Sequence, residues 1–399
     1  MERAAVFAVP TPARVTFAFA RQWDARLFAL AICFVPVSIA ITETFLAGAL
    51  LFRIAAIVRK RARIAVPGVF WFWLVWAGLE VIAWLRSPGL RTGWGEMRHL
   101  LLIAALFLLV PALSGVADRI AVWRGLVITA SVSSFYLIGH FFFELATYHG
   151  PLDPVVYLRG GGLLHHWMIY ATVEILVFAG LLELRHYYPE ERRWLLIALA
   201  VNTVAIVLSL TRTLWICALL VLILHLAWHG SRWLWLTPLI AVGFLALPGA
   251  VRSRVIESEN AGYYANAERI QMLEVGWRMI REHPLSGVGP GRVEETYTSY
   301  LAPGDPVPAY HGHLHNNLVQ LAAEFGIPAA VAAAVFVVAL GVALYSRNRD
   351  DEEPGLQFLR RAALLGLVGF VAAGMFDYTY GHSLGLILCA FVLLYNGAP

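Results

Sequence analysis

The chain has 399 residues, of which 60% are apolar and 14% charged, and its formal net charge is +4. A soluble domain carries roughly a quarter charged residues. This composition therefore excludes a soluble globular protein and indicates an all-α integral membrane protein, with spans of about 20 residues. The cysteines Cys33, Cys217 and Cys389 lie in apolar runs and predict neither a disulfide framework nor a metal site.

Apolar runs predict about twelve transmembrane helices and one long polar segment. The chain then divides into residues 1–247 with nine spans, residues 248–313 as a loop with amphipathic helices, and residues 314–399 with an interfacial helix and three spans. The expected spans, in chain order, are 25–41, 45–58, 69–85, 99–113, 120–146, 167–183, 195–210, 213–228, 234–247, 327–345, 362–376 and 384–395.

Arginine placement predicts the orientation of these spans. With a cytoplasmic N-terminus, 18 basic residues fall in cytoplasmic segments and 5 in short external connections. Cytoplasmic loops are enriched in Lys and Arg, whereas long loops are largely exempt from this bias. We therefore expect both termini in the cytoplasm, and the segment 248–313 on the external side together with Arg159 and Arg212.

The spacing of apolar residues predicts short helices over 265–282, 294–301 and 313–325. A glycine-rich turn, 286–291, follows the first of them. On that first helix the expected apolar face consists of side chains spaced by three or four residues: Ile270, Leu273, Trp277 and Ile280. The helix over 313–325 is expected to lie at the membrane surface, with its apolar face formed by leucines: Leu314, Leu318 and Leu321.

Three histidines in five residues, His311, His313 and His315, end the polar segment. Their alternate spacing is compatible with a zinc site, to which Asp377 or His382 could contribute, and also with a solvated turn at the membrane interface. A neutral imidazole is the natural acceptor for a hydroxyl proton near pH 7. We therefore favour a catalytic base and expect no metal.

Three arginines on the external side are candidates for anion binding. Arg212 lies in a very short connection between apolar runs, Arg159 precedes three glycines, and Arg269 lies on the expected helix 265–282. The segment 252–315 has six arginines against eight carboxylates, a net charge of −2, so individual arginines rather than a basic patch would bind an anion. Guanidinium suits bidentate phosphate binding. The structural alternative is an ion pair with a loop glutamate for Arg212 and Arg269, and a purely structural role for Arg159.

These residues occur in a recognisable order. The turn Ser209-Leu210-Thr211-Arg212 follows a span. The pattern Arg-x7-Trp-x-Met-Ile-x-x-His-Pro-Leu-x-Gly-x-Gly-Pro-Gly begins at Arg269, and His-Asn-x9-Gly begins at His315. Together they resemble the O-antigen ligase and polymerase superfamily of bacterial envelope glycosyltransferases, and the ligase best. Two departures are Ala329, where the ligase pattern usually has glycine, and Leu210-Thr211, where serine directly before the arginine is common.

The resemblance implies an inner-membrane enzyme of GT-C-like architecture with a periplasmic active site. The donor would be a polysaccharide on undecaprenyl diphosphate, and the acceptor a sugar hydroxyl of lipid A–core. His315, with His313 as second candidate, would be the base. Arg212, Arg269, Arg159 and Asn316 would bind substrate. Transfer would invert the anomeric configuration and need no metal or cofactor. Membrane lipid is an expected partner; nucleic acid is not.

Three alternatives remain open at the level of sequence. An O-antigen polymerase would use the same donor chemistry with another lipid-linked glycan as acceptor. A protein O-oligosaccharyltransferase would be expected to have a longer C-terminal part. A lipid or polysaccharide transporter without chemistry would place charges and broken helices at mid-membrane, whereas the candidate residues here gather at the external ends of the spans.

Overall fold

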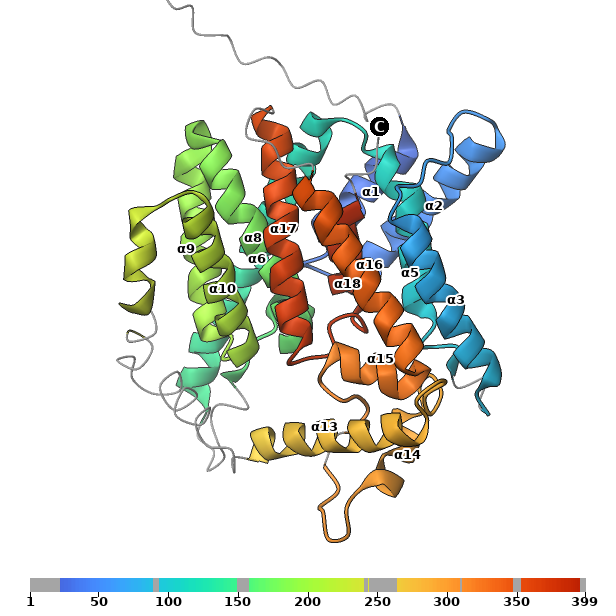
Figure 1. Ribbon diagram of the computed structural model, residues 1–399. Helices are drawn as coiled ribbons and strands as arrows, with labels where there is room; N and C mark the ends of the chain where they lie inside the picture. Colours follow the sequence, from blue (N-terminus) through green and yellow to red (C-terminus); the bar gives the residue numbers. More distant parts are fainter. Residues whose placement is uncertain are drawn as a thin grey trace, which may run out of the picture.

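The structure, a computed structural model, describes residues 22–88, 93–148, 158–239, 243, 264–308, 311–346 and 353–394 (Figure 1). These residues form helices, and no strand occurs among them. The α-helices are α1 Trp23–Phe34, α2 Ile39–Val58, α3 Phe70–Arg86, α5 Arg98–Leu109, α6 Val116–Thr147, α8 Trp167–Tyr187, α9 Arg192–Leu208, α10 Arg212–Trp228, α13 Tyr264–Glu282, α14 Val293–Thr296, α15 Asn317–Phe325, α16 Ile327–Ser346, α17 Pro354–Gly374 and α18 Ser383–Leu393. Short 3-10 helices connect them: η2 Val110–Ala112, η3 Gly162–Leu164, η4 Pro189–Glu191, η5 Arg232–Leu236 and η6 Tyr297–Tyr300.

Five helices of the described part are long and apolar enough to cross a membrane: α2, α6, α8, α16 and α17. Shorter apolar helices, among them α10 and α18, lie beside them. The all-helical prediction is therefore confirmed, and multiple candidate spans mark an integral membrane protein. The expected ninth span, 234–247, lies mostly outside the described residues, as do the stretches 1–21 and 248–263 and Tyr310.

The first two expected spans meet at a different place from the predicted one. The sequence predicted a turn over 42–44, but α1 ends at Phe34 and α2 already runs through Thr42, which is fully buried. Pro36 has no N–H to continue a helix, and the Ser38 hydroxyl accepts a hydrogen bond from the Ile41 N–H at 3.4 Å. The helix break therefore lies at a proline followed by an N-cap.

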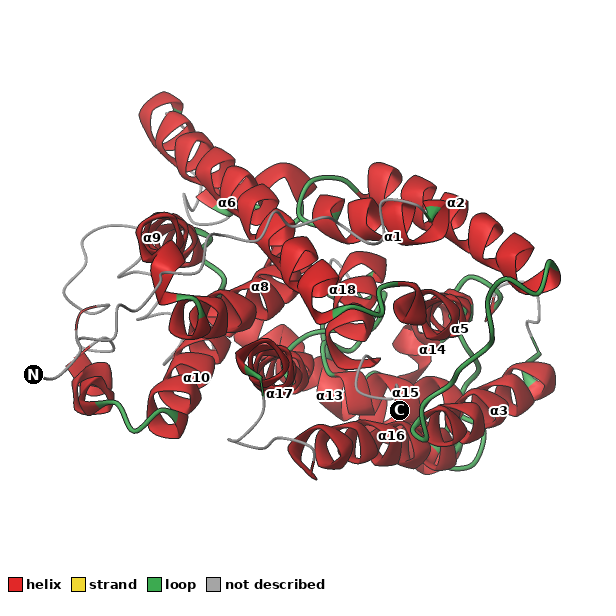
Figure 2. Ribbon diagram, turned by 90° about the horizontal axis from the view of Figure 1, so that it is seen from above, coloured by secondary structure: helices red, strands yellow, loops and turns green. Residues whose placement is uncertain are grey.

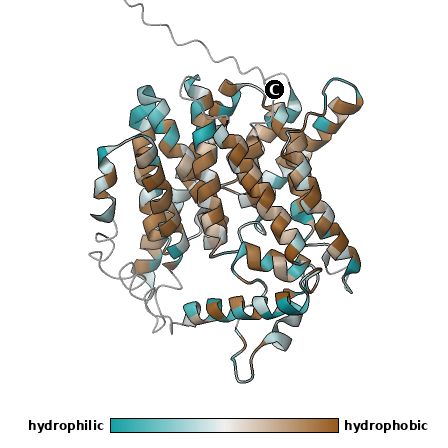
Figure 3. Cartoon of the chain, viewed as in Figure 1, coloured by the Kyte–Doolittle hydropathy of each residue, from teal (hydrophilic) through white to brown (hydrophobic). Residues whose placement is uncertain are grey.

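Helix α8 forms the centre of the molecule. Every residue from 170 to 184 is buried, and α8 packs against α17, α10 and α9. Seen from above, α8, α17 and α18 lie inside, while α2, α3, α9 and α16 lie outside (Figure 2). Figure 3 shows mostly apolar residues along the bundle and more hydrophilic ones at its ends and on α13. Such a distribution suits a bundle that spans a bilayer.

Helix α13 lies across one end of the bundle and packs against α15 (Figure 1). Gly276 makes this approach possible, because a Cβ there would come within 2.6 Å of Val319 Cγ1 and 2.8 Å of Leu314 Cδ1. The predicted range of α13 is confirmed, but its predicted apolar face is largely wrong. The packed face contains Met272, Val275 and Met279, whereas Trp277 is 60% exposed and Ile270 and Leu273 are also exposed.

Candidate active site

The histidine stretch ends where α15 begins. His315 has a left-handed backbone with φ of 49°, and Asn316 caps the helix: its Oδ1 accepts hydrogen bonds from the N–H groups of Leu318 at 3.0 Å and Val319 at 3.1 Å. The Asn316 Nδ2 donates to the carbonyl of Met375 at 3.0 Å. The helix therefore starts at residue 317 rather than 313. Asn316, predicted to bind substrate, uses its amide to fix the turn beside α17.

His315 meets a carboxylate from a distant part of the chain. Its Nδ1 lies 3.3 Å from Oδ1 of Asp377, and the Tyr378 N–H donates to the same oxygen at 2.8 Å. Burial alone would raise the pKa of Asp377, but the His315 hydrogen bond, the nearby His315 and His382 rings and the Tyr378 N–H lower it below its ordinary value. An ionised Asp377 accepts a hydrogen bond from the protonated Nδ1 of His315. Nε2 of His315 is then the nitrogen that can accept a proton.

His313 lies against His315 with its ring centroid 4.3 Å away, and packs on Tyr378 at 5.3 Å. Burial and the neighbouring His315 lower the pKa of His313 to about 3. A nitrogen that stays neutral until strong acid is a poor proton acceptor near pH 7. Between the two predicted bases, the electrostatics therefore favour His315. His311 lies aside, with its Nδ1 3.2 Å from the Pro308 carbonyl oxygen.

Two further histidines face the same carboxylate. His166 and His382 occupy the N-cap positions of α8 and α18 without a capping hydrogen bond from either side chain, and their ring centroids lie 6.1 Å apart. Burial lowers the pKa of both rings, while Asp377 acts in the opposite direction. Within the described residues, Nδ1 of His166 and Nε2 of His382 are buried without a hydrogen-bond partner. A polar group of a ligand would satisfy them.

His166 could not be predicted from the sequence, because only the meeting of the N-terminal ends of α8 and α18 places it near the predicted site. Arg159 lies on the same side: its guanidinium stacks over Trp167, the residue after His166, at 5.4 Å. The Arg159 Nε is buried and has no hydrogen-bond partner in the described part of the chain. Arg159 is thus placed beside His166 by a cation–π contact.

The glycine-rich turn holds the other end of α15. The N–H groups of Val288 and Gly289 donate to the carbonyls of Ala323 at 2.8 Å and Glu324 at 3.0 Å. Gly287 and Gly326, with φ of 64° and 86°, lie so close to opposing backbone that a Cβ on either would overlap it. The two glycine-containing motifs therefore belong to one structural unit, in which the turn closes directly on α15.

Glu324 lies inside this unit. The N–H of Gly291 donates to its Oε1 at 3.0 Å, and only 2% of the residue is exposed. Burial, followed by the nearby Glu96, raises the pKa of Glu324 well above its ordinary value. Glu96 in turn accepts a hydrogen bond from the Tyr378 hydroxyl at 3.0 Å. Tyr378, the residue next to Asp377, therefore binds a carboxylate whose charge acts on Glu324.

Arg212, the first residue of α10, contacts the first turns of α13, the helix that carries Arg269. The Arg212 NH2 donates to Oδ1 of Asn266 at 2.7 Å. Asn266 and Arg269 are three residues apart on α13 and so share one helix face. Both arginine side chains are half-buried. On α13 the partner of Arg212 is therefore an amide, and the ion pair with a loop glutamate stays an open alternative for both arginines.

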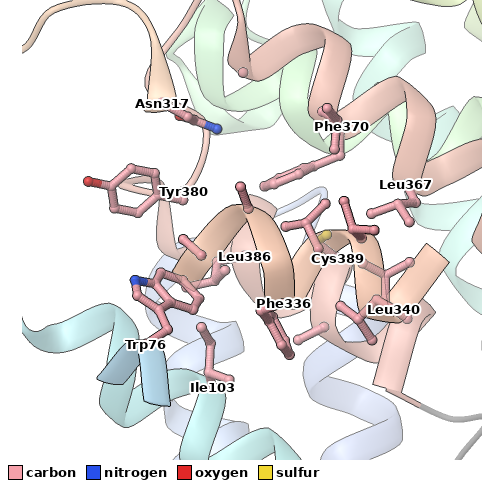
Figure 4. Close-up of a pocket in the computed structure, with 18 of the residues that line it drawn as sticks. Trp76, Ile103, Asn317, Phe336, Leu340, Leu367, Phe370, Tyr380, Leu386 and Cys389 are labelled. Atoms are coloured by element: carbon pink, nitrogen blue, oxygen red, sulfur yellow. The ribbon is translucent and has the colours of Figure 1, made fainter. Parts of the chain in front are cut away.

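An apolar cavity of about 260 Å³ opens between α16, α17 and α18 (Figure 4). Its walls are Phe336, Leu367 and Phe370 among other apolar side chains, and Asn317 and Tyr380 line one end. Asn317 follows the His315–Asn316 turn, and its Nδ2 donates to Thr379 Oγ1 at 2.7 Å. The cavity therefore leads from the apolar interior toward the histidine site.

Among the described residues, two groups of side chains have donor atoms close enough to bind a metal ion. In one, donor atoms of His313, His315 and Asp377 lie within 4.8 Å of one another. The zinc site considered from the sequence therefore remains an alternative for this group. In the structure, however, the Asp377 carboxylate already accepts a hydrogen bond from His315.

The second group, Glu183, His225 and His229, joins α8 to α10. Arg361 NH1 lies 3.3 Å from Nδ1 of His229, and an arginine can only donate. Nε2 of His229 then carries the proton, 3.1 Å from Glu183 Oε2. His225 Nδ1 lies 2.6 Å from the same carboxylate. This network is satisfied without an ion.

These features define an all-helical membrane protein with an imidazole–carboxylate pair where connecting segments meet. Residues 195–334 match the model of the family described as O-antigen ligase. The match includes Arg212, Arg269, His313 and His315. Asp377 and the other residues that face it from α8 and α18 lie outside it. No curated protein matches the chain.

Proposed function

We propose that the protein is an O-antigen ligase, transferring a polysaccharide from undecaprenyl diphosphate to a sugar hydroxyl of lipid A–core. The observation that carries this proposal is the His315–Asp377 pair, whose histidine lies in the same family match, 195–334, as Arg212 and Arg269. The pair supplies a proton acceptor for the attacking hydroxyl. Arginines of the same domain supply positive charge for a diphosphate.

In the proposed reaction, Nε2 of His315 takes the proton of the acceptor hydroxyl. The hydroxyl oxygen attacks the anomeric carbon from the face opposite the diphosphate, a new glycosidic bond forms, and the carbon–oxygen bond to the diphosphate breaks. The configuration at the anomeric carbon is thereby inverted. Asp377 holds the ring with Nδ1 protonated and stabilises the imidazolium that forms. The leaving undecaprenyl diphosphate carries away the bonding electrons.

Arg212 and Arg269 are assigned to the diphosphate of the donor. The contact of Arg212 with the first turns of α13, the helix that carries Arg269, allows two guanidinium groups to neutralise the charge that develops on the leaving group. Arg159, His166 and His382 are assigned to polar groups of the sugars, because each has a buried nitrogen without a hydrogen-bond partner among the described residues. Asn316 is assigned to positioning His315 rather than to binding. The chemistry requires no metal or cofactor.

The apolar cavity beside Asn317 is assigned to part of the polyprenyl chain. Its lining is almost entirely hydrocarbon, and its polar end lies next to the His315 turn. A lipid-linked donor needs such an arrangement, because its chain stays in the bilayer while its diphosphate reaches the aqueous interface. In this proposal the protein lies in the bacterial inner membrane, has a GT-C-like architecture of about twelve spans, and has both termini in the cytoplasm. The active site then lies at the periplasmic face.

A complementation experiment tests this function. Expression of the chain in a strain that lacks its O-antigen ligase is expected to restore long-chain lipopolysaccharide, and the His315→Ala variant, inserted to the same level, is not. A parallel strain that lacks the O-antigen polymerase is expected to show no rescue. Rescue of the second strain alone would instead establish the polymerase, and transport of the lipid-linked glycan without transfer would establish a transporter.

A further inference from the structure

A second cavity, of about 320 Å³ and partly polar, lies beside the glycine-rich turn. It is bounded by the C-terminal end of α3, the turn itself, and α14 with η6. Its lining includes two arginines and a histidine, Arg86, Arg292 and His283, and no carboxylate. Hydroxyl groups of serine, threonine and tyrosine complete the wall. The cavity therefore combines positive charge with hydrogen-bonding groups suited to hydroxyls.

The charges around this cavity leave Arg86 as its principal anion anchor. Arg292 donates through Nε to Glu295 at 3.0 Å and through NH1 to the Val288 carbonyl at 3.2 Å. His283 Nε2 lies 3.6 Å from Glu282. Arg86 is exposed, and no ion pair is found for it among the described residues. A guanidinium in this position is available to a phosphate or carboxylate.

Gly289 sets the width of the cavity. Its φ is 107°, and a Cβ there would overlap the Ser87 hydroxyl and come within 3.2 Å of Arg292 Cδ. The end of α3 can therefore approach the turn only because this residue has no side chain. The hydrogen bond from the Gly289 N–H to Glu324 ties the same residue to α15. The cavity is thus built into the unit that positions the histidine site.

Helix α13 relates this cavity to the proposed donor site. Arg212 binds Asn266 near its start, Gly276 contacts Leu314 beside His315 at its middle, and His283 of the cavity follows its end. At 1.5 Å per residue, Asn266 lies about 15 Å along the helix on one side of Gly276, and Glu282 about 9 Å on the other. The cavity and the diphosphate site are therefore on opposite sides of the proposed base.

We infer that this cavity binds an anionic sugar of the acceptor glycolipid, with Arg86 contacting its phosphate. The inference rests on the proposed function, in which inversion requires the acceptor hydroxyl and the leaving diphosphate to lie on opposite faces of the donor's anomeric carbon. Because Arg212 and Arg269 take the donor side, an arginine pocket beyond His315 falls on the acceptor side. A second phosphate site there recognises the acceptor without competing for the diphosphate.

Direct binding to the full-length protein in detergent tests the inference by calorimetry, with glucosamine 1-phosphate as probe. Arg86→Gln is expected to weaken binding about tenfold or more, because a charge-assisted hydrogen bond is lost. Arg86→Lys is expected to retain part of the affinity. Arg98→Gln, an exposed arginine at the start of α5, is the matched control and is expected to bind as the parent does.

Further probes separate the sources of phosphate. Unphosphorylated glucosamine, inorganic phosphate and phosphatidylglycerol vesicles are each expected to bind more weakly than the sugar phosphate. Equal binding of phosphate or of the vesicles would overturn the inference in favour of a general anion or lipid-headgroup site. An equal loss in Arg98→Gln would overturn it as well.

Transfer assays then distinguish this inference from the proposed function. Arg86→Gln is expected to raise KM for a phosphorylated acceptor about tenfold, with kcat and the donor KM unchanged. A rise in the donor KM instead would refute the acceptor assignment. Arg86-dependent sugar-phosphate binding by a protein without transferase activity would refute the proposed function alone. Normal transfer without such binding would refute only the assignment of this cavity to the acceptor.

Discussion

Nδ1 of His315 and Oδ1 of Asp377 lie 3.3 Å apart, although 62 residues separate them in the chain. The Tyr378 N–H also donates to that oxygen at 2.8 Å, so the carboxylate is fixed as well as the ring. Such an orienting carboxylate selects the imidazole tautomer whose other nitrogen is free to accept a proton. The base of the proposed reaction is therefore a pair of residues, one within the family domain and one beyond it.

Substitution of either member of the pair should reduce kcat. His315→Ala is expected to abolish transfer, and Asp377→Asn to lower kcat by about 10²-fold or more with KM little changed, because the amide no longer selects the tautomer. Steady-state kinetics with the lipid-linked donor provide the measurement. His311→Ala, which alters the neighbouring histidine outside the pair, serves as control. Full activity of Asp377→Asn would remove the carboxylate from the mechanism.

The arginines of the proposed donor site should act on donor binding. Arg212→Gln and Arg269→Gln are each expected to raise the donor KM about tenfold or more, since each removes a charge-assisted contact to the diphosphate. Asn266→Ala removes the neutral partner of Arg212 without removing charge and is expected to have a smaller effect. An unchanged donor KM in both arginine variants would contradict their assignment.

The burial of His313 predicts how stability depends on pH. In the unfolded chain its pKa is near 6.5, whereas in the folded protein it is about 3. Between these values only the unfolded state binds the proton, so stability should fall as the pH drops from about 6.5 toward 3 and should be fully present above 6.5. His313→Asn is expected to reduce this slope, as measured by the thermal midpoint in detergent at several pH values. Slopes identical in variant and parent would show that another group dominates.

Removal of divalent ions tests whether His313, His315 and Asp377 bind a metal ion. Treatment with EDTA is expected to leave transfer unaffected, because the proposed reaction uses positive charge from arginines and a proton acceptor from His315. The measurement is the initial transfer rate before and after chelation, with zinc added back. Loss of activity that zinc restores would establish a catalytic metal. A change in the thermal unfolding midpoint without a change in activity would indicate that a metal ion binds at the separate group around Glu183.

The glycine of the His-Asn-x9-Gly motif should be irreplaceable for a steric reason. Gly326 and Gly304 have nearly equal φ values, 86° and 89°, but a Cβ on Gly326 would overlap the Leu285 carbonyl, whereas nothing lies within 4 Å of one on Gly304. Gly304→Ala is expected to cost about 1–2 kcal/mol from backbone strain alone. Gly326→Ala should destabilise the protein more and displace α15. Thermal unfolding of the two variants measures the difference, and equal losses would mean that strain alone accounts for both.

Several features could be predicted from the sequence because they depend on local chemistry. Apolar content determined the membrane-protein class and the helical fold, since backbone polar groups in a bilayer must be satisfied within the spans. The motif order identified the family that the comparison supports over residues 195–334. The range of α13 also followed from its spacing. Its packed face did not, because apolar side chains occur around most of the helix and only the position of α15 selects among them.

The tertiary structure decided which polar groups meet. Asp377 and His382 come from the connection between α17 and α18, and His166 from the segment before α8. The sequence suggested Asp377 and His382 only as possible metal ligands, and nothing in it indicated that Asp377 pairs with His315 or that His166 lies beside His382. The position of the Asn316 turn likewise depends on a distant segment, because the Asn316 amide donates to the Met375 carbonyl. Composition determines that helices form and enter the membrane, whereas the packing of helix ends determines which charges face each other, because that depends on contacts between segments remote in sequence.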